Sequence, residues 1–261
     1  SLSISPNGSE KINGGAAGGL IQLSTEGEGL TLVYVDGTVG WRSIQDSQFS
    51  DIGANFISAT GGTITCCGNY KIHTFTGPGT FTVSAAAGSA SDNIVDYLVV
   101  AGGASGAHDR GGGGGAGGLR YFLNTTCAPT SGAPGAPLNG YGSPTPSGTA
   151  ITVTAQAYPI TVGSGGTVVP NGNGDAGNVS TFSTVTSAGG GRGGGGANPT
   201  TGGSGGSGGG ARDTSPATGG AGNTPPTTPA QGTAGGSVSG PGYGGGGGGA
   251  ISAGAGGGGP S

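Results

Sequence analysis

The sequence predicts an all-β protein with an irregular glycine-rich region. Glycine accounts for 70 of the 261 residues and is concentrated in runs. Between the runs, apolar and polar residues alternate in short stretches bounded by turn residues, which is typical of strands. No segment has the apolar spacing of an amphipathic helix. We therefore expect a short-strand N-terminal oligomerisation segment, a β-sandwich-like middle domain and a packed bundle of polyglycine or polyproline II-type helices.

Residues 1–47 form the first predicted domain, a strand-rich N-terminal segment. Its apolar residues fall in short alternating runs, separated by turn signals such as Pro6-Asn7-Gly8 and Asp36-Gly37. The segment is too short for an ample core of its own, so we expect oligomerisation to stabilise it. We interpret Trp41, the only tryptophan, as an anchor in a core or a subunit interface rather than a ring that stacks on a ligand.

Residues 48–187 form the second predicted domain, a β domain with glycine- and proline-rich insertions. Alternation over Tyr70–Phe75, a turn at 76–79 and a return over Thr80–Val83 predict a hairpin. The most apolar run of the chain, residues 94–101, predicts a buried central strand that leads directly into Gly102-Gly103.

The second domain contains three further predicted strand regions, namely 119–123, 151–162 and 179–186. Pro159 lacks an N–H group and is therefore expected at an edge or a bend of the second region. Residues 128–149 carry five prolines, Pro129, Pro134, Pro137, Pro144 and Pro146, and are expected to form an extended, irregular loop.

Residues 188–261 form the third predicted domain, which has almost nothing to bury. Its only large apolar side chains are Val238, Tyr243 and Ile251, which excludes a conventional core. Two states remain open, a disordered tail and a bundle of extended left-handed helices. Such helices have about three residues per turn and no internal hydrogen bonds, so their backbone groups can bond to neighbouring helices.

The punctuation of the glycine blocks favours the bundle. Turn-rich pieces at 198–201, 211–218 and 223–230 separate the blocks, as expected of reversals between rods, whereas a flexible linker has no need for them. Within the blocks, we expect Gly202–Gly208 to be one helix with an exposed edge, because every third position would face outward.

Charge and hydropathy exclude several functions. Seven basic residues are scattered among eleven acidic ones, so the chain lacks the clustered lysine and arginine that nucleic acids require. No apolar run reaches the length of about 18 residues that a membrane helix needs, and we expect no membrane insertion. The chain contains no methionine, and we interpret Ser1 as the start of a processed or trimmed fragment.

The three cysteines, Cys66, Cys67 and Cys127, are too few for a disulfide framework. Two interpretations stay open. They are buried or free thiols of a protein that folds in a reducing cytoplasm, or Cys127 forms one bridge to Cys66 or Cys67. Their spacing does not fit a zinc site.

The sequence offers little for catalysis, and we predict a protein that is not an enzyme and takes no cofactor or metal. The only histidines are His73 and His108, so triads and histidine-based metal sites are poorly supplied. A glycan hydrolase needs two carboxylates in a cleft, whereas Asp92 and Asp96, which are close in sequence, lie beside the predicted buried strand. The oxygen-rich stretch 170–175 has a single carboxylate, which fits a plain turn better than a calcium loop.

Charged and aromatic residues that interrupt the glycine blocks are the candidate binding residues. Rigid rods would present charged side chains at their turns, either for receptor contact or for solubility, and exposed rings suit contact with a sugar or a protein or serve as packing caps. The candidates are His108, Asp109, Arg110, Tyr141, Arg192, Arg212, Asp213 and Tyr243.

A family resemblance covers residues 70–261. KIHTFTGPGTFTV (71–83), VDYLVVAGG (95–103), GGGGGAGGLRYF (111–122), YPITVGSGG (158–166) and NGDAGNVSTFSTVTSAGGGRGGGG (173–196) follow one another in order. This series resembles the glycine-rich domain of bacteriophage tail-fibre and receptor-binding proteins. SLSISPNGSEKI (1–12) and LTLVYVDGTVGW (30–41) are similar to repeats of phage fibre and head-fibre proteins. The chain departs from the pattern at Ala104-Ser105 and at 108–110, where glycine would usually continue.

The resemblance implies a virion fibre protein that folds in the host cytoplasm and forms a homotrimer. As the distal, receptor-binding part of a tail or head fibre, it would contact a glycan or an outer-membrane protein of the bacterial host noncovalently, and it would bind other virion proteins. The alternatives are a purely structural head or tail fibre or decoration protein, an ice-binding protein and a cellular surface fibre. Threonine and serine do not form the sustained regular array expected of ice binding.

Overall fold

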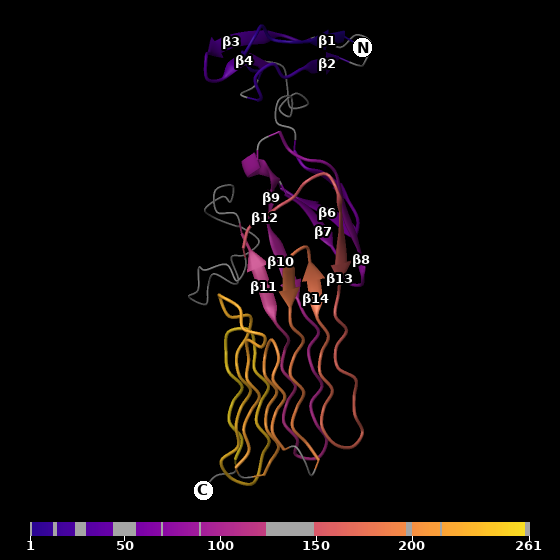
Figure 1. Ribbon diagram of the computed structural model, residues 1–261, viewed down its shortest axis with the longest axis vertical. Helices are drawn as coiled ribbons and strands as arrows, with labels where there is room; N and C mark the ends of the chain where they lie inside the picture. Colours follow the sequence, from indigo (N-terminus) through magenta and orange to yellow (C-terminus); the bar gives the residue numbers. More distant parts are fainter. Residues whose placement is uncertain are drawn as a thin grey trace. The chain divides into compact units, whose positions relative to one another are not determined.

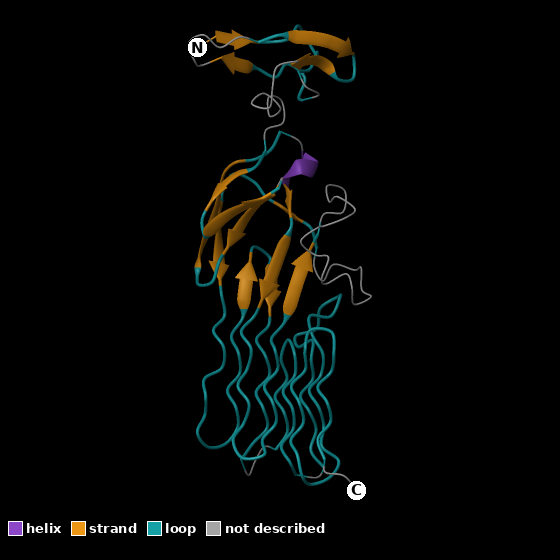
Figure 2. Ribbon diagram, turned by 180° about the vertical axis from the view of Figure 1, so that it is seen from behind, coloured by secondary structure: helices purple, strands orange, loops and turns teal. Residues whose placement is uncertain are grey.

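The computed structural model describes residues 2–12, 15–23, 30–43, 56–68, 70–88, 90–123, 149–196, 200–214 and 216–258. This described part is nearly all β, with several antiparallel sheets, no α-helix and one 3₁₀ turn, η1 (Ala90–Asn93) (Figures 1 and 2). The all-β prediction is therefore confirmed. The predicted loop at 128–149 lies outside the described residues except for its last position.

The strands are short, and most of them pair in two-stranded sheets. The bounds of the strands are β1 Leu2–Ile4, β2 Ile21–Leu23, β3 Leu32–Asp36, β4 Gly40–Ser43, β5 Ser58–Thr60, β6 Thr63–Cys67, β7 Tyr70–Thr74, β8 Gly79–Ala85, β9 Ile94–Val95, β10 Tyr97–Val100, β11 Leu119–Phe122, β12 Ile151–Thr152, β13 Ala157–Thr161, β14 Ser180–Phe182 and β15 Val185–Ser187. One sheet has five strands in the order β15-β14-β13-β8-β5. The two-stranded sheets pair β1 with β2, β3 with β4, β6 with β7, β10 with β11 and β9 with β12.

The chain divides into two compact units, and the predicted division at 47 and 187 stays a prediction. The first unit consists of Ser1–Thr60, Thr82–Val95 and Thr152–Ala157. In its N-terminal part, the half-buried Trp41 packs edge-on against Tyr34 and donates a 2.8 Å hydrogen bond from Nε1 to Oε2 of Glu10. Ile12 and Ile21 are the buried apolar residues there.

The second unit, which consists of Gly61–Phe81, Asp96–Ile151 and Tyr158–Ser261, has an aromatic core beside the strands. Phe182 lies at its centre, with ring centroids 6.0 to 6.2 Å from those of Phe81, Tyr97 and Tyr158. All four rings are buried. This cluster gives the unit the apolar burial that its glycine-rich part lacks.

The strands 70–74 and 79–85 form as predicted, but their predicted pairing is wrong. β7 pairs with β6, and β8 lies between β5 and β13 instead. The tight turn after Cys67, where Gly68 has a φ of +56°, brings β6 and β7 together. β8 instead turns Phe81 and Val83 into buried positions.

The apolar run 94–101 is not one buried central strand. It forms β9 and β10, and along β10 Tyr97 and Val99 are buried whereas Leu98 and Val100 are exposed. β10 pairs with β11 and β9 pairs with β12, each in a separate two-stranded sheet.

Pro159 lies inside a sheet, in β13, and the predicted edge position is wrong. A bend does precede this strand, at residues 155–156. The register with β14 starts at Ile160 opposite Phe182, after the proline that cannot donate a hydrogen bond. The region 179–186 is a hairpin of two strands, and Ser183 in its turn has a φ of +52°.

The strand pairs continue into extended glycine-rich chains without a break in register. β10 and β11 end with Val100 opposite Leu119. The N–H groups of Ala101, Ala104 and Ala107 then donate to the carbonyls of Gly118, Gly115 and Gly112, respectively. The spacing of three residues replaces the spacing of two in a strand ladder, so every third residue faces the same neighbour.

The glycine-rich segments run side by side in the second unit (Figure 2). They are 101–107, 111–118, 163–168, 174–178, 188–195, 200–206, 207–212, 217–222, 232–238, 243–249 and 253–258. One segment bonds to several neighbours in turn. Gly112 and Gly115 donate to the carbonyls of Gly194 and Gly191, while Gly113 donates to that of Gly245.

Glycine is required inside this arrangement because the backbones almost touch. A Cβ atom added at Gly220 would lie 1.8 Å from the carbonyl oxygen of Gly203, and one added at Gly112 would lie 1.9 Å from that of Gly210. The small apolar cluster in these segments consists of Ala211, Ala217 and Val238. Backbone hydrogen bonds between segments therefore take the place of a side-chain core.

The segment Gly202–Gly208 is not the single helix with an exposed edge that the glycine-serine pattern predicts. The chain bends at residues 205–207, and Arg212 and Gly209 donate back to the carbonyls of Thr200 and Gly203. Ser207 is fully buried, and its hydroxyl oxygen lies 2.8 Å from the carbonyl oxygen of Gly117 and 3.0 Å from that of Gly249. The single O–H donates to one of these carbonyls or is shared between them, which explains a serine at an interior position.

Candidate functional site at the end turns

The glycine-rich segments reverse direction at a set of turns far from the strands (Figure 1). We call residues 108–110, 170–173, 212–214 and 239–243 the end turns. Backbone bonds hold them against one another, because His108 donates to the carbonyl of Gly172 and Asp213 donates to that of Arg110. Residues far apart in the sequence thus meet at one end of the segments.

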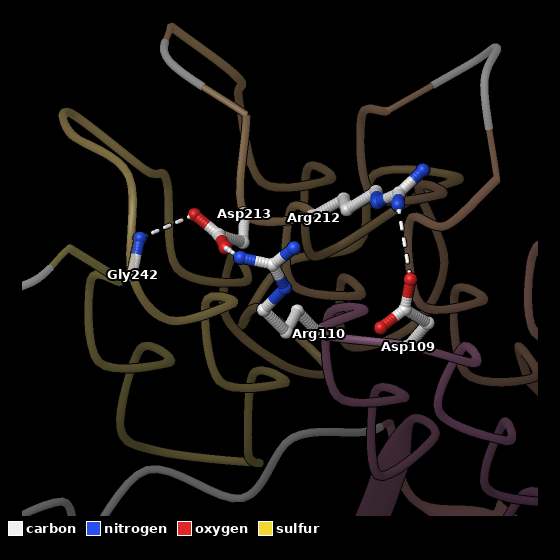
Figure 3. Close-up of polar contacts among 5 residues, drawn as sticks. All are labelled: Asp109, Arg110, Arg212, Asp213 and Gly242. Atoms are coloured by element: carbon white, nitrogen blue, oxygen red, sulfur yellow. Dashed lines mark hydrogen bonds and ion pairs between the residues drawn. The ribbon is translucent and has the colours of Figure 1, made fainter.

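Asp213 joins three of the end turns (Figure 3). Its carboxylate lies 3.2 Å from Nη1 of Arg110 through one oxygen and accepts a 2.5 Å hydrogen bond from the N–H of Gly242 through the other. The Asp213 side chain is only 2% exposed, whereas that of Arg110 is 66% exposed. A buried carboxylate needs such partners, and charge-assisted bonds of this kind are the stronger ones.

Arg212 forms a second link between the same two turns. Its Nη2 lies 3.5 Å from Oδ2 of Asp109 (Figure 3). Its Nη1 donates to the carbonyl of Gly196. Each of the two neighbouring residues 109 and 110 therefore pairs with one of the two neighbouring residues 212 and 213. All four charges at these positions are matched within the end turns.

Asp109 and Arg110 have left-handed backbone conformations, with φ values of +46° and +53°. Residues other than glycine seldom adopt such values, and they persist where the surroundings hold them. Here the two ion pairs, together with the hydrogen bond from the backbone N–H of Asp213 to the carbonyl of Arg110, stabilise these conformations. The turn 108–110 therefore presents its side chains in a fixed direction.

The structure brings together four of the eight candidate residues, Asp109, Arg110, Arg212 and Asp213. Tyr243 directly follows Gly242 and is 65% exposed, and His108 is also exposed. Arg192 lies within the segment 188–195 rather than in a turn, and its Nη1 is buried without a hydrogen-bond partner. Tyr141 lies outside the described residues.

Two features near the end turns were not singled out from the sequence. The N–H of Gly242 has no signature, because every residue except proline carries one. Val168, 87% exposed, is a large apolar side chain two positions before the turn 170–173. Asp175, the single carboxylate of the stretch 170–175, accepts a 2.7 Å hydrogen bond from the hydroxyl of Thr167, a contact that the sequence does not reveal.

The hydroxyl and N–H of Thr167 lower the pKa of Asp175 below its usual value of 3.8. Its carboxylate is therefore held by a side chain of the neighbouring segment. Across the described ranges, no group of three histidine, cysteine, aspartate or glutamate residues could hold a metal ion.

Cys66 and Cys67 are free, exposed thiols in β6, which excludes a bridge between them in this structure. Cys127, the other proposed partner, lies outside the described residues. In the part of the chain that the structure describes, no helix has the length and apolar character needed to span a membrane.

Comparisons with models of protein families, with curated proteins and with solved structures find no match to this chain. The geometry of the end turns and the sequence resemblance therefore carry the functional argument.

Proposed function

We propose that the protein is a virion fibre protein of a bacteriophage and that its glycine-rich end is an adhesin, which contacts the bacterial surface noncovalently. The observation that carries this proposal is the end turns themselves. They present exposed charged and aromatic side chains on a backbone support that is fixed by hydrogen bonds. Loops on a rigid scaffold are where binding residues are commonly found.

The support itself is part of the proposal. Bonds that recur every three residues along 101–107, 111–118 and 188–195 fit helices with about three residues per turn, as in polyproline II. We infer that the glycine-rich segments are a bundle of such helices. Backbone hydrogen bonds make most of the contacts between the segments. Exposed side chains of the turns, such as those of His108 and Tyr243, are therefore free to vary without disturbing the bundle.

The remaining parts of the proposal concern assembly. The strands of residues 2–43 expose Val33, Tyr34 and Val35, and isolated two-stranded ribbons are only marginally stable in water. This supports an N-terminal segment that is stabilised by other copies of the chain. In line with the sequence resemblance, we propose that the assembly is a homotrimer attached to other virion proteins. Three adhesive ends on one fibre would raise a weak single-site affinity through effective concentration.

Binding to cells tests the proposal. The fluorescently labelled chain is mixed with a panel of bacterial isolates, and bound fluorescence is measured by flow cytometry. We expect binding to some isolates and its loss when His108 and Tyr243 are both replaced by alanine. The matched control is Ile251→Ala, which removes an exposed apolar side chain outside the end turns. Binding that survives the double substitution would contradict the end turns as the binding site. A chain that binds none of the isolates would contradict the adhesin and favour a purely structural fibre.

A further inference from the structure

Tyr243 and Arg110 lie side by side, although 133 positions separate them in the sequence. The segments 111–118 and 243–249 run parallel, because Gly113 and Ala116 donate to the carbonyls of Gly245 and Gly248. A Cβ atom added at Gly244 would lie 2.3 Å from the carbonyl oxygen of Gly111 and 3.0 Å from that of Arg110. The two segments thus start at the same level, with the exposed Arg110 directly before one of them and the exposed Tyr243 as the first residue of the other.

The same carboxylate fixes both residues. Asp213 pairs with the guanidinium of Arg110 and binds the N–H of Gly242, the residue before Tyr243 (Figure 3). The Asp213 side chain is almost fully buried, whereas the side chains of Arg110 and Tyr243 are about two-thirds exposed. The ring and the guanidinium are therefore presented to solvent from adjacent, anchored backbones.

We propose that Tyr243 and Arg110 form a subsite for an uncharged sugar, so that the adhesin end binds a neutral glycan of the bacterial surface. This inference rests on the proposed function and names the class of its ligand. The tyrosine ring offers an apolar face with a polar tip, on which a pyranose ring packs. The N–H groups of Arg110 that do not face Asp213 donate to sugar hydroxyls.

The charges at this end argue against an anionic ligand. Arg110 and Arg212 are each matched by an aspartate, and Asp175 adds a further negative charge nearby. An acidic polysaccharide would meet no unmatched cation among the described residues of the end turns. A neutral sugar needs none, because hydroxyl groups bond to an already paired guanidinium.

The scarcity of side chains argues against a protein ligand. Stable protein interfaces bury on the order of 1,000 Å² or more around an apolar centre. Among the described residues near the end turns, Tyr243 and Val168 are the exposed large apolar side chains, and glycine flanks Tyr243 on both sides. One ring with a neighbouring donor is enough for a single sugar unit.

Saturation-transfer NMR on the full chain tests the subsite directly. The probes are the methyl glycosides of mannose, galactose, glucose and N-acetylglucosamine, with glucuronic acid and glucose 6-phosphate as anionic counterparts. We expect transfer to at least one neutral glycoside, its loss in Tyr243→Ala and its retention in Tyr243→Phe and Ile251→Ala. Arg110→Ala should weaken binding about tenfold, as expected for a lost charged hydrogen bond. Transfer to none of the neutral probes, preference for the anionic ones, or unchanged transfer in Tyr243→Ala would overturn the proposal.

A second arm separates failure of the subsite from failure of the adhesin. Isolates that bind the labelled chain are treated with periodate, which oxidises the vicinal diols of sugars, or with a protease. We expect periodate to abolish binding and protease to leave it. Binding that is lost only after protease would overturn the sugar subsite while the adhesin stands, and an absence of binding to any untreated isolate would count against the adhesin itself.

Discussion

Asp213 is the residue on which the geometry of the end turns depends most. It is the buried member of a pair whose other member is exposed, and it also binds the backbone of the turn 239–243. The pair Arg212–Asp109 is longer, at 3.5 Å, and its carboxylate is 57% exposed. The two ion pairs, similar in sequence, therefore differ in what they contribute.

Asp213→Ala should lower the free energy of unfolding by about 1 to 3 kcal/mol, because it leaves the N–H of Gly242 and the guanidinium of Arg110 without their acceptor. Asp109→Ala is the matched control. Its carboxylate is 57% exposed and Arg212 keeps the carbonyl of Gly196 as an acceptor, so we expect a loss of less than about 1 kcal/mol. Urea unfolding of the two variants measures both values. Equal effects of the two substitutions would show that Asp213 has no special role.

The Thr167–Asp175 contact makes a pH-dependent prediction. Because the pKa of Asp175 is lower in the folded chain than its usual 3.8, its contribution to stability is present above pH 3.8 and is lost as the pH falls through the lowered value. Thr167→Val removes the hydroxyl that is the main cause. We expect this substitution to raise the pKa of Asp175 toward 3.8, measured from the carboxyl ¹³C shift during an NMR titration. An unchanged pKa would mean that the hydroxyl does not stabilise the carboxylate.

At the scale of elements, the strands set the positions of the glycine-rich segments. The antiparallel pairs β10–β11 and β14–β15 continue into pairs of glycine-rich segments that keep the same register. In the second case, Ser180 lies opposite Ser187, and the N–H groups of Gly177 and Gly174 then donate to the carbonyls of Gly190 and Gly193, respectively. The aromatic core beside the strands therefore fixes the register of chains that cannot fix it themselves. This offsets the entropy lost when glycine is ordered.

Interior glycines should tolerate no side chain. Gly220→Ala should destabilise the fold by about 3 kcal/mol, the upper end of the range for overpacking, because its Cβ would meet the carbonyl of Gly203 at 1.8 Å. Gly240→Ala is the control, since an added Cβ there meets nothing within 4 Å, and its effect should stay within about 0.5 kcal/mol. Thermal unfolding compares them, and a harmless Gly220→Ala would contradict the close packing.

Strand positions could be predicted from the sequence better than strand partners. Alternation and β-branched residues locate β7, β8, β11 and β14, because both signals are local. The partner of β8 depends on which strands share the core around Phe81, and this is decided by packing over long sequence distances. The half-exposure of β10 is likewise decided by what covers each face, which Leu98 and Val100 do not reveal on their own.

At the scale of the whole molecule, the residues of the candidate site could be predicted from the sequence, but their partners could not. The charged residues that interrupt the glycine blocks could be selected from the sequence because glycine-rich surroundings make them conspicuous. The pairing of Asp109 with Arg212 and of Arg110 with Asp213 could not be predicted, since it depends on which segments become neighbours. The turn 239–243 joins this site through a backbone N–H, which no sequence pattern marks.

The central claim for the molecule is that its glycine runs are a rigid support and not linkers. Hydrogen–deuterium exchange at individual amides, followed by NMR, tests this most directly. We predict that the N–H groups of Gly112, Gly115, Gly191 and Gly210, all bonded to neighbouring segments, exchange orders of magnitude more slowly than in an unfolded chain. Exchange at unfolded-chain rates in these residues, with β10, β11 and β14 still protected, would contradict the claim and leave the end turns without a fixed scaffold.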